Sequence, residues 1–465
     1  MSKSNSSTLA RKSARGAMGK KEGELQPVNP NAAGIDLGSR EHYVAVPPDR
    51  DERPVRCFGC FTPELRRMAD WLKECGIETV AMEATGVYWV PVFQILESYG
   101  FEVVLANPRY IKNVSGRDTD VGDAEWLRRL HSYGLVAGSF RPAQDICVLR
   151  SYWRQREELV RCASIHIQHM QKALDQMSLH LHKVLSDITG VTGMQIIRAI
   201  VAGERSPLVL AQMRHPQVKS SREEIAQALS GDYRQEHIFA LRQALELYDT
   251  YRAKIEECDQ EISRCLKTFD SKTAGQAPLP PAPKRKPRKN QPTFQLREEL
   301  QRIAGVDLTR IEGIDALTAQ TMIAECGLDM SRFPTEKHFA SWLGLSPHNR
   351  VTGGKRLSGK TRKVDNRAAT ALRIAAQSLH GSQSALGAFY RRMRARLGAP
   401  KAITATAHKL ARLIYRLLKY GHAYVAQGME QYERQCQERL TRSLSHRAAQ
   451  LGFQLVNQAT GELVS

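Results

Sequence analysis

The chain of 465 residues carries 68 Lys and Arg against 48 Asp and Glu, which gives a formal net charge of +20. This length predicts two or more domains, and the excess of positive charge favours a polyanionic partner, nucleic acid before an anionic membrane surface. The sequence has no run of about 18 apolar residues and no signal-peptide pattern. We therefore expect a cytoplasmic protein that makes no use of a membrane.

The nine cysteines are scattered, which is not typical of a secreted disulfide framework. Cys57 and Cys60 form a single pair at zinc-ligand spacing, but no second pair of ligands follows nearby. This pattern favours a hairpin with two small buried thiols over a zinc site.

Residues 1–31 are rich in Ser, Lys, Arg and Gly and predict a disordered basic tail. Residues 32–144 alternate short apolar runs with helical stretches, which is the layout of an α/β domain. We expect a first strand that begins near Ala33 and closes at Val46. The further elements expected in this domain are a strand at 56–61, a helix at 63–75, a strand at 78–82 that ends at Glu83, a helix at 87–99 and a strand at 101–106.

Asp36 lies within the apolar segment 34–38, Gly-Ile-Asp-Leu-Gly, and is therefore expected on a buried strand. Burying a carboxylate without a partner costs several kcal/mol, so a cation or a phosphate-bound metal is expected beside it. One alternative is an aspartate that caps a tight hairpin turn. The segment also resembles the first phosphate motif of actin-like sugar kinases and chaperone ATPases, but we find no second Asp-x-Gly loop of the kind those folds require.

A helix is expected to open at 118–127, where Asp120 and Asp123 lie three residues apart and so share one helical face. The plain interpretation is that both are first-turn acids that favour the helix dipole. Together with Asp36 and Glu83, however, they make four carboxylates in one α/β unit. Hard oxygen ligands from several elements are what a pair of Mg²⁺ ions needs, so we interpret the four as a two-metal constellation.

Residues 145–270 predict a helical arm, because apolar residues recur at three-to-four spacing over 148–185 and 233–266. We expect these two segments to form a long antiparallel pair of the coiled-coil type. The arm also holds four histidines without an evident acidic or cysteine partner, which we expect on polar faces and not as metal ligands: His166, His169, His180 and His182.

Two segments, 187–200 and 311–325, combine a glycine turn with a following helix and resemble the helix-hairpin-helix motif. In that motif backbone N–H groups at a turn such as Gly313 meet a nucleic-acid phosphate. A helical packing corner needs similar glycines, and this alternative stays open. Between the two segments, residues 271–293 are rich in Pro, Lys and Arg and predict an inter-domain linker.

The last domain is expected at 294–425 and is mainly helical, with helices at 366–380, 384–397 and 402–419, followed by a partly helical tail at 426–465. Before these helices, residues 339–363 predict a loop dense in glycine, hydroxyl groups and basic side chains, suited to nucleic-acid phosphates. The contacts expected there are Gly353, Gly354, Lys355, Arg356, Lys360, Arg362 and Lys363.

Four segments, taken together, resemble the IS110 family of insertion-sequence transposases over most of residues 32–425: 34–38, Met-Glu-Ala-Thr-Gly at 82–86, Thr-Asp-Val-Gly-Asp-Ala at 119–124, and the block from Gly344 to Lys355. The resemblance implies an RNase H-like, RuvC-like N-terminal domain with the DEDD tetrad Asp36, Glu83, Asp120 and Asp123, a coiled-coil arm and a C-terminal domain with a catalytic serine. It also implies Mg²⁺ or Mn²⁺, donor and target DNA, a structured guide RNA, and a homo-oligomer, dimer or tetramer. Such a protein would work in the bacterial cytoplasm, on the nucleoid when bound.

One residue departs from the family pattern. Thr352 stands where the family has its serine, before the glycines of the C-terminal block, and Ser358 is the nearest serine. Threonine keeps a hydroxyl that can attack phosphorus, although its methyl group crowds it. The sequence thus predicts a DNA transposase and recombinase with Thr352 as nucleophile. The alternatives are a RuvC-like nuclease or Holliday junction resolvase, and a non-catalytic DNA-binding protein.

Overall fold

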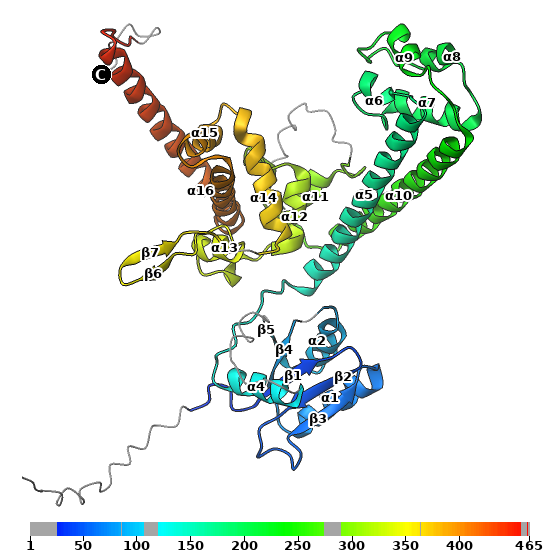
Figure 1. Ribbon diagram of the computed structural model, residues 1–465. Coiled ribbons are helices and arrows are strands. Elements are labelled where there is room, and N and C mark those ends of the chain that lie inside the picture. Colours follow the sequence, from blue (N-terminus) through cyan, green and yellow to red (C-terminus); the bar gives the residue numbers. More distant parts are fainter. Residues whose placement is uncertain are drawn as a thin grey trace, which may run out of the picture. The chain divides into compact units, whose positions relative to one another are not determined.

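The computed structural model describes residues 26–84, 86–106, 120–273, 290–362, 364–456 and 463. The chain divides into two compact units, Met1–Arg141 and Pro142–Ser465, which are described separately below (Figure 1). Most of the predicted tail at 1–31 and of the predicted linker at 271–293 lies outside the described residues, as does Lys363. Within the described residues, no helix is long and apolar enough to cross a membrane.

The N-terminal unit is built on a five-stranded sheet in the order β3-β2-β1-β4-β5. Its strands are β1 (Ala32–Leu37), β2 (Glu41–Ala45), β3 (Val55–Gly59), β4 (Thr79–Glu83) and β5 (Glu102–Ala106). The first three pair antiparallel, whereas β4 pairs parallel with both β1 and β5. A mixed sheet of this kind agrees with the predicted α/β class.

The single first strand predicted from Ala33 to Val46 is wrong. The structure has two strands, β1 and β2, joined by a tight turn that is closed by the Gly38 N–H donating to the carbonyl of Glu41 at 3.0 Å. A side chain at Gly38 would lie 2.5 Å from that carbonyl oxygen, so only glycine fits the turn. Gly38, Ser39 and Arg40 are a polar turn signal between two apolar runs, and the prediction joined the two runs across it.

The pair Cys57 and Cys60 also differs from its prediction. Cys57 lies on β3 and is exposed, while Cys60 follows the strand and is half-buried, so the thiols are not two buried core groups. The Cys57 thiol points toward a carboxylate, with 3.5 Å between Sγ and Oε2 of Glu41, and burial raises its pKa above the usual thiol range.

Helices cover both faces of the sheet. On one face α1 (Thr62–Glu74) and α2 (Trp89–Ser98) pack on the alternate strand residues Ala33, Ile35 and Leu37 of β1 and Val80 and Met82 of β4. On the other face α4 (Asp120–Ser132) brings Leu127 against Ala81 and Ala106. Since side chains alternate along a strand, the positions between the apolar ones face α4.

α4 runs antiparallel to β1 and β4, and its position is fixed at two places. Near its end, His131 bonds to Thr79 at the start of β4, with 2.8 Å between Nε2 and Oγ1. In its middle it lies on Gly34 of β1, where a Cβ atom would be 2.3 Å from the Arg128 nitrogen and 2.4 Å from the Ala124 oxygen. The absence of a side chain at Gly34 is what lets the helix backbone touch the strand.

The second unit begins with a long pair of helices, α5 (Gln144–Gln176) and α10 (Gln235–Lys267), which pack along their lengths. Their contacts run antiparallel: Arg156 pairs with Asp259, and His166 stacks on Tyr251 with ring centroids 5.3 Å apart. α5 ends earlier than the predicted limit near 185, because Ser178 takes a left-handed conformation (φ 57°).

At the tip of the arm, four short helices join α5 to α10: α6 (Leu181–Val184), α7 (Val191–Ala202), α8 (Pro207–Gln212) and α9 (Arg222–Ala228). The prediction that His180 and His182 have no acidic partner is wrong. The Asp175 carboxylate lies 3.6 Å from Nδ1 of His180 and 3.3 Å from Nδ1 of His182. Asp175 is in the last turn of α5, and the chain folds back there, which the spacing alone did not indicate.

The rest of the unit is mainly helical, as predicted, and contains α11 (Leu296–Ala304), α12 (Ala316–Cys326), α13 (Glu336–Trp342), α14 (Arg367–Ser378), α15 (Ala385–Leu397) and α16 (Ala399–Gln450), with short 3-10 turns η1 (Leu308–Arg310), η2 (Met330–Arg332) and η3 (Leu379–Gly381). α14 and α15 agree closely with their predicted ranges. α16 is much longer than the predicted 402–419 and continues past a non-helical residue, Gly421. The predicted loop at 339–363 is in part a hairpin of β6 (Arg350–Thr352) and β7 (Lys355–Ser358).

Replacing Gly34 with alanine should loosen α4 from the sheet. The new methyl group meets backbone atoms that cannot rotate away, so the free energy of unfolding should fall by about 1–3 kcal/mol, toward the upper end of that range. Urea denaturation of the purified protein measures the loss. Gly59→Ala in the same unit is the control, because its methyl group would meet only the flexible Glu64 side chain, at 3.3 Å. Equal losses for the two variants would contradict the proposed close approach.

Candidate active site

Asp36 and Glu83 lie next to each other at one edge of the sheet. β1 and β4 are parallel, with Ile35 opposite Met82, so Asp36 and Glu83 are the next residues along the two strands. Strand alternation turns both toward the α4 face, because Gly34 contacts α4 and Ala81 packs against Leu127. Both carboxylates are half-buried.

The start of α4 lies at the same edge. His131, near the end of the helix, is held at the first residue of β4, so an antiparallel helix brings its own first turn to the far ends of the strands. Asp120 and Asp123 belong to that first turn. Asp123 is half-buried with a buried Oδ1 atom, while the side chain of Asp120 is outside the described set.

Three described carboxylates therefore gather at the C-terminal edge of two parallel strands, under the positive end of a helix dipole. An oxygen-only donor set suits a hard divalent cation such as Mg²⁺. Among the described residues, no three His, Cys, Asp or Glu side chains are grouped so as to hold a metal ion. The oxygen donors of the three carboxylates are nevertheless of the chemical type that suits a divalent cation.

A buried polar contact anchors the helix that carries two of these acids. The Thr79 hydroxyl donates to the carbonyl of Glu102 at 3.1 Å, so it accepts from Nε2 of His131. The carbonyl of His131 in turn accepts from the Asn29 side-chain amide at 2.9 Å. Burial lowers the pKa of His131 below its usual value, against a smaller opposing effect of Glu102. The imidazole is therefore neutral when it holds α4 to the sheet.

The second set of predicted residues lies on the β6–β7 hairpin of the other unit. Thr352 is exposed at the end of β6, directly before the turn of Gly353 and Gly354, whose φ angles are 53° and 75°. No atom lies within 4 Å of the Cβ positions of either glycine, so the turn is open to solvent. Ser358 ends β7 at the base of the hairpin, where its Oγ accepts from the Lys360 N–H at 3.3 Å.

The predicted nucleic-acid contacts differ in their surroundings. Lys355 and Lys360 are exposed, whereas Arg362 donates to the carbonyl of Ser341 at 2.7 Å and so secures the hairpin base to α13. The side chain of Arg356 is not described. The Cβ position of Gly313 faces Leu379 and Ala375, with 3.1 Å to Cγ and 3.2 Å to the carbonyl oxygen, which favours the packing-corner alternative for this glycine.

Comparison with known proteins identifies the family. A transposase model of the DEDD type of IS110 elements matches residues 33–179, and a model described as transposase of the IS116/IS110/IS902 family matches residues 307–391. A probable family 20 transposase of Pseudomonas aeruginosa is 23% identical over 405 residues, 85% of this chain and 99% of that relative. The chain belongs to the IS110 family of transposases. It is therefore an enzyme that acts on DNA.

A second relative of the transposase is the putative transposase y4pF/y4sB of Sinorhizobium fredii. It is 30% identical over 129 residues, which are 25% of this chain and 32% of the relative. The two family matches leave out residues 180–306, and thus the tip of the arm together with all of α10. The predicted resemblance to an IS110 transposase is confirmed, and the likeness of residues 34–38 to kinase phosphate motifs is a coincidence of a short string.

The transposase also has a basic surface that was not among the predicted contacts. Residues 366–429 contain no Asp or Glu, and α15 exposes Arg391, Arg392, Arg394 and Arg396. Arg392 and Lys409 lie over the Phe389 ring, 5.6 Å and 4.8 Å from its centroid. The sequence signal for this surface was the complete lack of acids, and not a motif.

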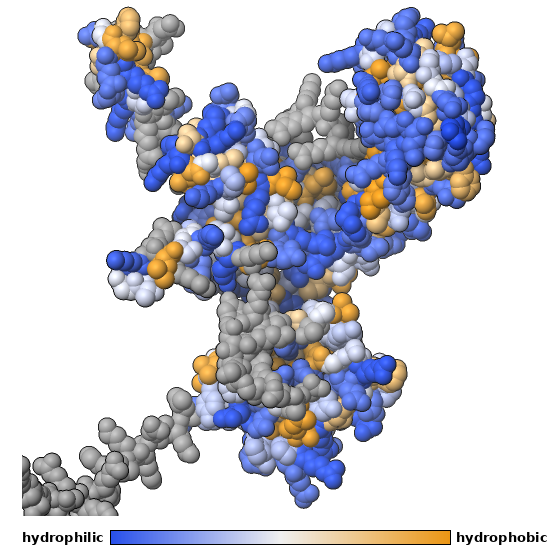
Figure 2. All heavy atoms as spheres, viewed as in Figure 1, coloured by the Kyte–Doolittle hydropathy of each residue, from blue (hydrophilic) through white to orange (hydrophobic). Residues whose placement is uncertain are grey.

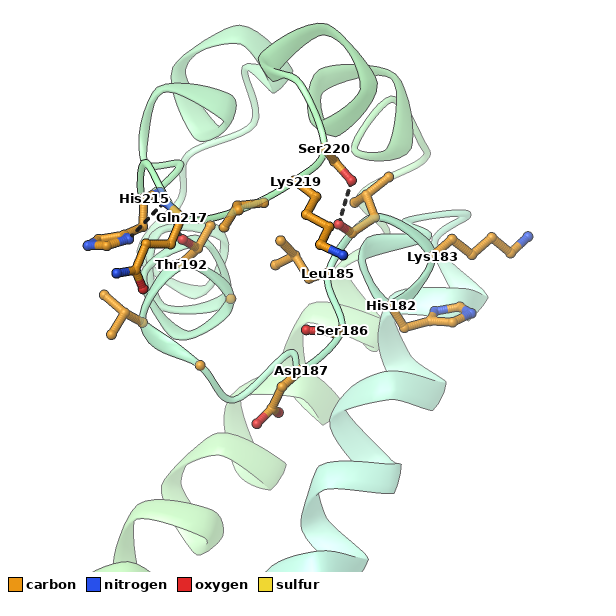
Figure 3. Close-up of a pocket in the computed structure, with 15 residues that line it drawn as sticks. His182, Lys183, Leu185, Ser186, Asp187, Thr192, His215, Gln217, Lys219 and Ser220 are labelled. Atoms are coloured by element: carbon orange, nitrogen blue, oxygen red, sulfur yellow. Dashed lines mark hydrogen bonds between the residues drawn. The ribbon is translucent and has the colours of Figure 1, made fainter. Parts of the chain in front are cut away.

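The tip of the arm has a cavity of about 970 Å³ at the first helix-hairpin-helix-like segment (Figure 3). It lies between the start of α7 and residues 215–220, and Ser220 closes one side by donating to the Val184 carbonyl at 2.8 Å. In Figure 3 the Lys219 side chain lies over the opening, while Lys183 points away from it. This is an open recess of mixed polar and apolar lining, with Lys219 as the lysine that reaches it.

Acid should destabilise the α4 anchor. Because the folded-state pKa of His131 lies below the ordinary value of 6.5, the unfolded chain binds more protons at and below that pH. The contribution of the His131 imidazole to the free energy of unfolding is fully present above about pH 6.5. It is lost as the pH falls from there toward the lowered pKa. Unfolding free energies of the wild type and of His131→Gln, measured across that window, should differ in slope. His169→Gln, at an exposed histidine of α5, is the control.

Proposed function

We propose that this transposase cuts and rejoins DNA strands by phosphoryl transfer, with Asp36, Glu83, Asp120 and Asp123 as the metal-binding tetrad and Thr352 as the hydroxyl nucleophile. The observation that carries the proposal is the placement of Asp36 and Glu83 side by side at the ends of two parallel strands, under the first turn of α4. The alternation of apolar residues on β1 and β4 explains why both carboxylates face that helix.

The tetrad would hold Mg²⁺, or Mn²⁺, through carboxylate oxygens alone. When bound, the metal supplies charge neutralisation and polarises the phosphate that is attacked. The chain's own contribution is to keep four negative groups close together although they repel one another. Packing of α4 on Gly34 and the His131–Thr79 contact hold the backbones in place against this repulsion.

The position of Thr352 on the hairpin supports its assignment as the nucleophile. Its side chain is exposed on a strand end, next to two glycines with open space around them, so a DNA backbone can approach closely. Lys355, its partner across the hairpin, is exposed and offers a positive charge for the phosphate. The attack would form a bond between the Thr352 oxygen and phosphorus and break the bond to a DNA 3′ or 5′ oxygen, which leaves with a proton.

Other parts of the proposal concern partners. The formal net charge of +20 and the acid-free stretch 366–429 support contact with nucleic-acid phosphates. The resemblance to the IS110 family adds a structured guide RNA to donor and target DNA as a proposed partner. The antiparallel pair α5–α10 would act as a coiled-coil arm, and the glycine turn at its tip as a helix-hairpin-helix contact. An enzyme that joins a donor DNA to a target DNA holds two DNA molecules at once, which favours a homo-oligomer, a dimer or a tetramer. We place this reaction in the bacterial cytoplasm.

Loss of a tetrad carboxylate should stop the chemistry without releasing the nucleic acid. Asp36→Asn and Glu83→Gln keep size and shape, so folding should be unaffected, and strand exchange on a supplied donor and target should fall by at least about a hundredfold. DNA binding, measured by mobility shift, should stay within about twofold, because basic groups hold the backbone. Wild-type exchange rates in both variants would exclude these carboxylates from the site.

The nucleophile can be identified by its covalent product. A reaction stalled with a nicked or phosphorothiolate substrate should leave protein joined to a DNA end through Thr352. Thr352→Ser should keep or raise the rate because it removes the crowding methyl group, and Thr352→Ala should abolish the adduct. Ser358→Ala is the matched control and should leave adduct formation unchanged.

Two outcomes would redirect the proposal. If Ser358→Ala removes the adduct while Thr352→Ala does not, the nucleophile lies at the base of the hairpin. If neither variant matters and no covalent species is trapped, the enzyme cuts with water as a RuvC-like nuclease or junction resolvase does.

A further inference from the structure

The long C-terminal helix α16 changes character at Gly421. Before this residue its buried side chains pack against α13, α14 and α15, and they include Ala402, Leu410 and Leu417. Gly421 has a φ angle of 79° and a ψ angle of −178°, which interrupts the helical backbone. After it the helix resumes and continues to Gln450, and Figure 1 shows this red end standing apart from α14 and α15.

The distal part of α16 has no buried side chain among those that the structure describes there. Apolar side chains are nevertheless exposed at its end: Leu444 is 45% exposed, Leu451 74% and Phe453 69%. Figure 2 shows orange, apolar patches at this C-terminal end of the chain. A helix of this length gains most of its stability by packing an apolar face against a partner, and this one has no such packing along the described part.

The sequence of this segment has one continuous apolar stripe. Its members recur at spacings of three or four, as one face of a helix requires: Val425, Met429, Tyr432, Cys436, Leu440, Leu444, Ala448 and Leu451. The apolar positions of the stripe are spaced symmetrically about its middle, because the pairs 425/451, 429/448, 432/444 and 436/440 are each centred at or beside residue 438. A second copy of the helix turned end for end would therefore meet apolar residues along its whole length.

The charges of the segment show the same symmetry with opposite sign. Glu430 and Glu433 precede the centre and Glu438 lies at it, with Arg434 as the one base between 428 and 438, whereas Arg439, Arg442 and Arg447 follow with no acid up to 449. Antiparallel pairing about residue 438 sets Glu430 near Arg447 and Glu433 near Arg442 of the other copy, while Glu438 meets its own counterpart next to Arg439. Parallel pairing would set like charges side by side, which is unfavourable.

We infer that residues 422–451 form an antiparallel helical interface with the same segment of a second copy of this chain. The occupant is a second copy and not nucleic acid, because the glutamates of the first half would repel phosphate and an apolar stripe offers it no bond. This inference concerns a segment outside the proposed catalytic and nucleic-acid residues, and it stands whether or not their roles are correct.

The first test adds one carboxylate on or beside the stripe. Leu444→Asp places it on the stripe, and Ser443→Asp places it at the neighbouring exposed residue. Neither position is buried in the chain, so folding should be kept. Sedimentation equilibrium of the full-length protein should show that Leu444→Asp raises the dissociation constant of the self-associated protein by at least about tenfold. The reason is that a carboxylate is costly in an apolar contact. Ser443→Asp should stay within about twofold of the wild type.

The second test uses the charges and decides the orientation. Changing Glu430 and Glu433 together to arginine should weaken association, and adding Arg442→Glu and Arg447→Glu to the same chain should restore it. A parallel pair would be insensitive to the first change, since it merely exchanges one like-charge contact for another.

Three results would overturn the inference. They are a monomeric wild-type protein at micromolar concentration, an unchanged mass for Leu444→Asp, or equal effects of the two single substitutions. If Leu444→Asp weakened DNA binding in a mobility shift while the mass stayed the same, the stripe would contact nucleic acid and the self-association would be wrong.

Discussion

The contact between α4 and Gly34 is the constraint on which the N-terminal unit depends. Four carboxylates can share one edge of a sheet only if the helix that carries two of them lies directly on the strands that carry the others. The close approach needs a residue without a side chain, and the backbone atoms of Ala124 and Arg128 occupy the space where a Cβ would be. His131 and Thr79 then fix the opposite end of the helix through a buried hydrogen bond. The acidic site is thus held by packing at one point and by a polar anchor at another.

Much of this unit could be predicted because its sequence patterns are local. The strand that ends at Glu83 and the helices on either side of it are each indicated by apolar periodicity within a few residues, and the structure has them within one or two residues of the predicted limits. Gly34 belongs to the sequence motif at 34–38. Its contact with α4, however, joins residues some ninety positions apart in the sequence, and no local pattern indicates such a contact. The reversal at Gly38 is different, because the polar residues Ser39 and Arg40 mark it locally and the prediction nevertheless joined the apolar runs on either side into one strand.

The errors in the second unit have a common physical cause. Periodicity shows where a helix can form, but the end of a helix depends on single backbone angles such as that of Ser178, and partners across a fold depend on tertiary contacts. Asp175 therefore went unrecognised beside His180 and His182. The residues around Thr352 were predicted as a loop because glycine and basic residues dominate there, although the short strands on each side pair well enough to make a hairpin.

The ion pair inside the helical arm limits how its two long helices can pair. The side chains of Arg156 and Asp259 are only 3% and 4% exposed, and Arg156 also donates to the Asn290 carbonyl at 2.9 Å. A slip of α5 against α10 by one turn would leave two buried charges without each other, which costs several kcal/mol. The two helices of the arm therefore have one permitted register, and the arm has a fixed length. A helix of 33 residues spans about 50 Å at 1.5 Å per residue, so groups at its two ends are held apart by the length of roughly 15 base-pair steps.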